Sequence, residues 1–213
     1  MHSIMLNSLA SNARKYWAMH IADDVSRAGF RVGGLPPGGV TPTFVNELTQ
    51  YFGTFPITDS RDQEMSIFCT FDYLDPESAN FITRNIEKPL DAGSEVIECV
   101  FHNPSMRSEN SDLASELHAY SVSVGAQSID DPENETCGVP HKIGGIAFLR
   151  NSSARARKAS SDLAEAGYIH VLQFGYPGPR DCKVKGAWPF HNYRFHLYLR
   201  ESGEHYEYKA LLV

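Results

Sequence analysis

The alternation of apolar and polar residues predicts β-strands through most of this chain. The clearest case is YRFHLYLRE, residues 193–201, where Phe195, Leu197 and Leu199 share one face and polar residues occupy the other. Runs rich in aromatic and β-branched residues are typical of buried strands. Such runs predict further strands at residues 65–73, 95–102, 121–125, 168–174 and 204–213.

Three other segments have patterns typical of helices. Between residues 4 and 28 the apolar side chains recur at spacings of three and four without a proline, which predicts a long N-terminal helix that ends before Gly29. Residues 41–52 fit a short helix, because Pro42 is tolerated in a first turn. The polar residues 151–167 contain helix formers and end at Gly167, so they also predict a helix.

A glycine- and proline-rich stretch, RVGGLPPGGVTP, follows the predicted N-terminal helix at residues 31–42. This composition indicates an irregular loop with glycines at positive φ. The spacing fits neither GxGxxG nor GxxxxGK[ST], the two glycine-rich patterns that bind phosphate groups. We therefore interpret it as a structural loop.

The chain contains signs of an internal duplication. FCTFDYLDP (68–76) and VLQFGYPGP (171–179) share a phenylalanine, a tyrosine and a proline at an offset of 103 (171 minus 68). Each follows a Gly-Gly element, VGGLP (32–36) or IGGIA (143–147), and precedes another apolar strand. We predict an α+β fold in one domain, residues 1–213. Two pseudo-repeated antiparallel β units, 26–105 and 136–205, would pack together under the N-terminal helix.

Composition and charge limit the classes of partner. The formal net charge of −7 disfavours a nucleic-acid binder, which needs a basic surface. No apolar run approaches the length of a membrane span, and the N-terminus lacks the layout of a signal peptide. We expect a cytoplasmic protein with free thiols, in which Cys69 and Cys99 are small core residues.

No catalytic or metal-binding pattern stands out. The four cysteines are scattered, and none of the nine histidines has the spacing typical of a zinc site. We expect no metal, no cofactor and no enzymatic activity. One alternative stays open: a small-ligand site or an enzyme that uses the glycine-rich loops and His141, with Cys137 nearby in sequence.

The acidic segment SIDDPENETCGVPH, residues 128–141, offers a different kind of site. It places four negative charges within six residues, which indicates either a solvated loop or a surface that meets a basic protein. Exposed aromatic residues would supply the anchors of such an interface. The candidate partner-binding residues are Asp130, Asp131, Glu133, Glu135, Tyr73, Tyr176 and Trp188.

Four segments together resemble the YwqG-like family, a bacterial domain of unknown function. They are SRAGFRVGGLPP (26–37), SIFCTFDYLDP (66–76), HKIGGIAF (141–148) and YIHVLQF (168–174), with Gln173 at the family's glutamine position. Two departures are Ile146-Ala147-Phe148, where the family continues Gly-Tyr-Pro, and WPFHNYR (188–194), where it has a Gly-Asp-x-Gly turn.

The resemblance implies a function but no catalytic residues. Some members of the family are immunity proteins of toxins delivered by type VI secretion, including nuclease toxins. It therefore suggests that this chain binds a cognate toxin effector and blocks its active site.

Overall fold

The structure, a computed structural model, describes residues 14–22, 30–56, 63–70, 86–91, 96–104, 113, 115, 117–130, 139–149, 151–177, 181–186, 188–190, 193–203 and 205–213. Within these residues lie one helix and eleven strands. They are β1 (Lys15–Ala22), β2 (Arg31–Val32), β3 (Thr49–Pro56), β4 (Glu64–Thr70), β5 (Leu90–Asp91), β6 (Ile97–His102), β7 (Tyr120–Ile129), β8 (His141–Gly144), α3 (Ala154–Glu165), β9 (Ile169–Phe174), β10 (Phe195–Ser202) and β11 (His205–Leu212).

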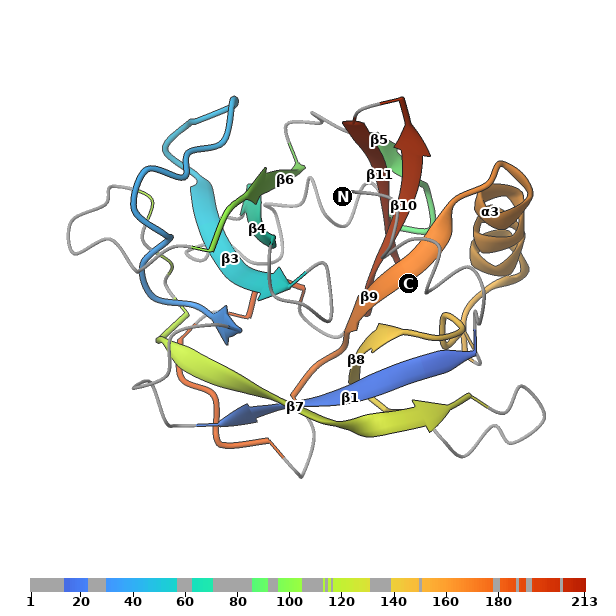
Figure 1. Ribbon diagram of the computed structural model, residues 1–213, viewed down its shortest axis with the longest axis horizontal. Helices are drawn as coiled ribbons and strands as arrows, with labels where there is room; N and C mark the ends of the chain where they lie inside the picture. Colours follow the sequence, from blue (N-terminus) through green and yellow to red (C-terminus); the bar gives the residue numbers. More distant parts are fainter. Residues whose placement is uncertain are drawn as a thin grey trace.

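All eleven strands belong to one antiparallel sheet that curves into a nearly closed barrel (Figure 1). The order is β5-β11-β10-β9-β8-β1-β7-β2-β3-β4-β6. Contacts join β6, at one end of the sheet, to β11, next to the short β5 at the other end: the backbone N–H of Cys99 on β6 donates to Tyr208 Oη on β11, at 3.1 Å. The rings of Phe101 and Tyr206 lie 5.4 Å apart across the same gap.

The predicted α+β fold with a helix over the sheet is therefore wrong. Residues 15–22, in the middle of the predicted N-terminal helix, form β1, which pairs with β7 and β8. Trp17, Met19 and Ile21 alternate toward the core as strand residues do, and the extra residue of the register shift opposite Ala18 lies on β7. The helix predicted at residues 41–52 is also absent, because β3 begins at Thr49 and residues 41–48 are irregular.

Other elements follow the prediction closely. Strands at 97–102, 169–174, 195–202 and 205–212 and the helix α3 lie where the sequence patterns placed them. Ser153 caps α3 because its Oγ accepts the N–H of Ala156, and Gly167 ends the helical segment at φ 84°. No helix in the described part of the chain is long and apolar enough to cross a bilayer.

Large aromatic side chains fill the barrel. Phe52, from β3, packs edge-to-face against three rings: Phe174 at 5.3 Å, Phe190 at 4.7 Å and Trp188 at 5.5 Å between centroids. All four are buried, and edge-to-face packing of this kind adds to the free energy gained by burial. Cys69 and Cys99 belong to the same core as free thiols, which confirms their predicted place.

The sheet order is symmetric about the β1–β7 pair. Apart from the short β5, the strands β8, β9, β10 and β11 on one side match β2, β3, β4 and β6 on the other. The symmetry also relates single residues of β1 and β7. A shift of 103 positions takes Met19 to Val122 and Ile21 to Val124, and these four residues form the facing pairs Met19–Val124 and Ile21–Val122. The symmetry includes β1, β7 and β11, which extend beyond the predicted repeats 26–105 and 136–205, and the duplication stays a prediction. The sheet order matches β9 with β3, so the compared segments 68–76 and 171–179 start in strands that do not correspond.

The two Gly-Gly elements have one conformation. Gly33 and Gly34 have φ 69° and 72°, and Gly144 and Gly145 have φ 73° and 71°. Each pair follows a buried basic residue two positions earlier, Arg31 on β2 and Lys142 on β8, and these strands occupy matching places in the sheet. The motif is therefore a structural element: a strand carrying a buried cation ends in two left-handed residues, which glycine adopts without strain.

Candidate functional site

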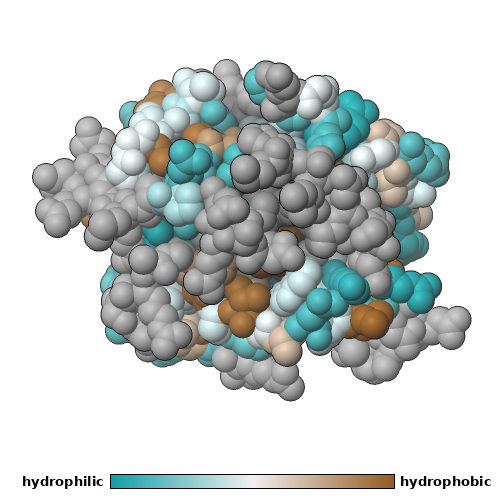
Figure 2. Space-filling view, in the orientation of Figure 1, coloured by the Kyte–Doolittle hydropathy of each residue, from teal (hydrophilic) through white to brown (hydrophobic). Residues whose placement is uncertain are grey.

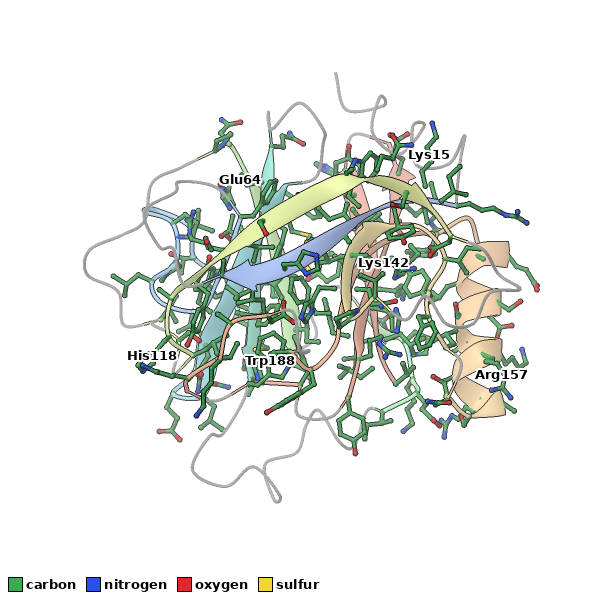
Figure 3. All side chains as sticks on the ribbon, turned by 90° about the horizontal axis from the view of Figure 1, so that it is seen from below. Lys15, Glu64, His118, Lys142, Arg157 and Trp188 are labelled. Carbon is green, nitrogen blue, oxygen red and sulfur yellow. The ribbon has the colours of Figure 1, made fainter. Side chains whose placement is uncertain are left out.

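Buried polar side chains gather on the outer face of β8, β9 and β10. On β10, Phe195, Leu197 and Leu199 point into the barrel, so His196 and Tyr198 point outward. These outward residues are nevertheless buried, because α3 packs over Tyr198. Lys142 on β8, labelled in Figure 3, and His170 and Gln173 on β9 are also buried. Buried groups of this kind need hydrogen-bond partners.

Three of them bond to backbone atoms of residues 145–148, which we call the strap, whereas His196 bonds to His170 and Tyr198 bonds to Ser160. His170 Nδ1 donates to the carbonyl of Gly145 at 3.1 Å, and Lys142 Nζ donates to the carbonyl of Ile146 at 2.6 Å. At Phe148, the N–H donates to Gln173 Oε1 and the carbonyl accepts from Arg194, both at 3.0 Å. Strand side chains thus replace water for an irregular segment, which stabilises its burial.

Asp130 belongs to this arrangement. Its Oδ2 accepts from Lys142 Nζ and from the N–H of Ile146, both at 2.7 Å. A Cβ on Gly145 would lie 2.1 Å from the same oxygen, so the backbone there must be glycine both for space and for its φ. The first residue of the predicted acidic interface is therefore buried and ion-paired.

His170 and His196 form a neutral pair beside this cation. Their rings approach at 3.2 Å, Nε2 to Nδ1. Burial, with Lys142 nearby, lowers the pKa of His170 to about 3. Burial, with His170 nearby, lowers the pKa of His196 well below its usual value. Because His170 donates from Nδ1 to Gly145, its Nε2 accepts from His196.

His141 lies on the opposite, inner face. It is fully buried, and the centroid of its ring lies 4.9 Å from that of Phe174 and 6.1 Å from that of Trp188. Its Nε2 donates to Asp181 Oδ2 at 3.1 Å, while Asp181 Oδ1 accepts the N–H of Ile21 at 2.8 Å. The pair ties residues 181–182 to β1 from inside the core, and this position gives no support to a ligand site built on His141.

The aromatic candidates occupy contrasting places. Trp188 is 7% exposed and lies in the core, so its ring does not form part of a surface. Tyr176 is 60% exposed and follows β9 directly. Tyr73, Asp131, Glu133 and Glu135, together with Cys137, lie outside the described residues.

Tyr176 projects beside the end of the acidic segment. The N–H of Gly175 donates to the carbonyl of Pro140 at 2.8 Å, and Gln173 Nε2 donates to the carbonyl of Val139 at 2.7 Å. At its other end the segment is held by Asp130 through Lys142. The structure thus holds Asp130 at one end of the segment and residues 139–140 at the other, and it places the exposed Tyr176 next to residues 139–140.

The described residues show little that resembles a small-molecule site. They contain no group of three or more His, Cys, Asp or Glu side chains that could hold a metal ion. One cavity, between residues 44–49 and the strands β4 and β6, has a volume of about 10 Å³, about enough for one water molecule. On the face shown in Figure 2, the described hydrophobic residues occur in small groups among polar ones.

Sequence reasoning missed the residues that hold the strap. Lys142 gives the signal: a basic residue in an otherwise apolar strand that ends in Gly-Gly, as in Arg31-Val32-Gly33-Gly34. That repeated pattern indicates a buried cation with a specific partner. His170, Gln173 and Asp130 could not be linked to it, because their contacts are made between different strands and loops.

Comparisons of the chain with protein-family models, with curated proteins and with solved structures find no match. The resemblance to the YwqG-like family therefore stays a hypothesis.

Proposed function

We propose that this chain is a cytoplasmic immunity protein that binds a cognate bacterial toxin effector and blocks its active site without chemistry. The proposal rests on one observation in the structure: Tyr176 is exposed beside the anchored end of an acidic segment. An aromatic anchor next to a charged rim is the usual composition of a protein interface.

Charge supports the same partner class. The segment contains Asp131, Glu133 and Glu135 in a chain of net charge −7. An acidic surface attracts a basic protein and raises the rate of association, most strongly at low salt. A nuclease is a basic partner of this class, because its cleft must bind the phosphates of a nucleic acid. The family resemblance points to such toxins independently of the structure.

The test uses the products of neighbouring genes. Each would be co-expressed with this chain, and rescue from toxicity and formation of a complex would be measured. We expect one product to be toxic alone, to be neutralised by this chain and to bind it with a rate that falls as salt increases. If no neighbouring product binds and none is neutralised, the proposal is wrong.

Two variants locate the surface. Tyr176→Ala and the triple charge reversal Asp131→Lys, Glu133→Lys, Glu135→Lys should each weaken the complex at least tenfold. A matched control, the charge reversal Asp162→Lys with Glu165→Lys on the exposed side of α3, should leave binding unchanged. A complex equally sensitive to the control would place the interface elsewhere.

A further inference from the structure

One ring nitrogen of the buried histidine pair has no hydrogen-bond partner. His196 is fully buried, and within the described part of the chain nothing bonds to its Nε2. His196 Nδ1 donates to His170 Nε2, and His170 Nδ1 donates to the carbonyl of Gly145. The two protons of the neutral pair therefore lie in these two hydrogen bonds, and His196 Nε2 keeps a bare lone pair.

A third proton could enter the pair only at His196 Nε2, because the other three nitrogens already share the two bonds. It would create a buried N–H without an acceptor, which is costly. Burial opposes a positive charge on His196 and lowers its pKa, and the cations of Arg194 on β10 and Lys142 on β8 act in the same direction. The closed structure therefore keeps the pair neutral.

The other groups around the pair do not offset this effect. Asp130, at the end of β7, already pairs with Lys142. Burial and Lys142 lower the pKa of His170 by more than three nearby carbonyls raise it, those of Gly144, Gly145 and Leu172. The helix α3 and the strand β11 add uncharged side chains to this face: Ala159, Ser160, Leu163 and Leu211.

The strap passes over this pair. Phe148, at one end of the strap, is held by Gln173 and Arg194. Gln173 lies opposite His196 on β9, and Arg194 lies two residues before His196 in the chain. At its other end the strap is held by His170. The middle of the strap is exposed, so the strap separates the histidine pair from solvent.

The same strap holds both ends of the acidic segment. At one end, Asp130 Oδ2 accepts the N–H of Ile146. At the other end, the side-chain amide of Gln173 joins the strap to the segment, because its Oε1 accepts the N–H of Phe148 and its Nε2 donates to the carbonyl of Val139. Movement of the strap would therefore loosen both ends together.

We propose that the strap is a pH-sensitive switch, which lifts as the histidine pair takes up protons and thereby frees both ends of the acidic segment. With the strap open, His170 and His196 reach water and bind protons near their ordinary pKa of about 6.5, whereas the closed form excludes these protons. Each histidine shifts the equilibrium toward the open form by up to about tenfold per pH unit below that value. The switch lies in the strap and does not rest on the identity of any partner.

The first test measures amide hydrogen exchange of the native protein at pH 7 and pH 5, with each rate divided by its intrinsic rate. The amides of Ile146 and Phe148 report the strap, that of Gly175 reports its contact with Pro140, and those of β10 report unfolding of the whole barrel. The first three should be less protected than β10 at pH 7. Their protection should fall by about tenfold or more at pH 5.

Two results would overturn the proposal. Strap amides that are as protected as those of β10 at both pH values would show that the strap opens only with the whole barrel. Strap protection that does not change between pH 7 and pH 5 would show that the histidines do not control the opening. Both results are read from the unsubstituted chain, so neither depends on a variant that folds.

A matched pair of variants assigns the effect to the histidine pair. His196→Gln removes one proton site, so the fall in strap protection between pH 7 and pH 5 should be smaller by roughly threefold or more. His205→Gln, at an exposed position of β11, should leave the fall unchanged. The comparison uses the pH dependence within each protein, so a general loss of stability does not produce the expected result. Equal falls in the two variants would contradict the switch.

Discussion

Asp130 and Lys142 form a buried ion pair, with Oδ2 and Nζ 2.7 Å apart and side chains 10% and 3% exposed. Both also bond to the backbone of Ile146, so the pair holds the strap against β8. A buried ion pair contributes little more to stability than apolar residues of similar size would. Removing one member is costly, however, because it leaves the other as an uncompensated buried charge. This asymmetry gives the first prediction.

Lys142→Met should destabilise the protein by about 3–5 kcal/mol, because Asp130 would remain buried without its cation. Urea denaturation measures the change in the free energy of unfolding. The control is Lys158→Met, which breaks an exposed pair with Asp162 on α3 and should cause no measurable change. Equal changes in the free energy of unfolding for the two substitutions would show that burial of Asp130 does not require the charge of Lys142.

Stability should fall as the pH is lowered from 7 to 5. His170 has its pKa lowered to about 3 and His196 has its pKa lowered as well, whereas both titrate normally in the unfolded chain. Below the unfolded pKa of about 6.5 the unfolded state binds more protons, so stability present above that pH is lost as the pH falls toward 3. His170 should contribute about 2 kcal/mol of loss at pH 5, and His196 should add to the loss in the same direction.

The measurement is the free energy of unfolding as a function of pH. His170→Gln should reduce the slope between pH 7 and 5, because the variant removes one group that protonates on unfolding. A substitution at the exposed His205 provides the control and should leave the slope unchanged. An identical slope in all three proteins would contradict the neutral histidine pair.

Gly145→Ala should be far more destabilising than Gly39→Ala. Both glycines have positive φ, 71° and 77°, so the backbone strain of alanine is similar, about 1–2 kcal/mol. A Cβ at residue 145 would also lie 2.1 Å from an atom of Asp130 and 2.9 Å from an atom of Tyr16. A Cβ at residue 39 would have no neighbouring atom within 4 Å. Thermal unfolding should show a larger decrease in Tm for Gly145→Ala, and equal decreases would argue against the close approach.

Trp188→Ala and Tyr176→Ala should separate a core residue from a surface one. Trp188 packs edge-to-face on Phe52, so its loss should cost about 3–5 kcal/mol. Tyr176→Ala should change stability by less than about 0.5 kcal/mol. Denaturant unfolding distinguishes them, and a large loss on removing Tyr176 would contradict its placement at the surface.

Cys69 and Cys99 should resist labelling by maleimide in the folded protein. Burial raises the pKa of Cys69 to about 12 and raises the pKa of Cys99 also, so neither forms the reactive thiolate near neutral pH. Peptide mass spectrometry before and after denaturation measures the modification of each. Fast labelling of Cys69 under native conditions would show that the core opens locally.

The sequence alone identified the elements whose local pattern and long-range environment agree. In β10 the apolar residues Phe195, Leu197 and Leu199 alternate without interruption, and the helix formers of α3 are followed by Gly167. Each signal is local, so no distant contact was needed to interpret it.

The tertiary structure decided the rest. Residues 15–22 have apolar spacings that fit a helix, but pairing with β7 and β8 makes them a strand, because tertiary hydrogen bonds outweigh weak helix propensity. The partners of Asp130, His170 and Gln173 likewise depend on which strands become neighbours. A polar residue in an apolar run shows only that some partner is needed, and the folded sheet determines which one it finds.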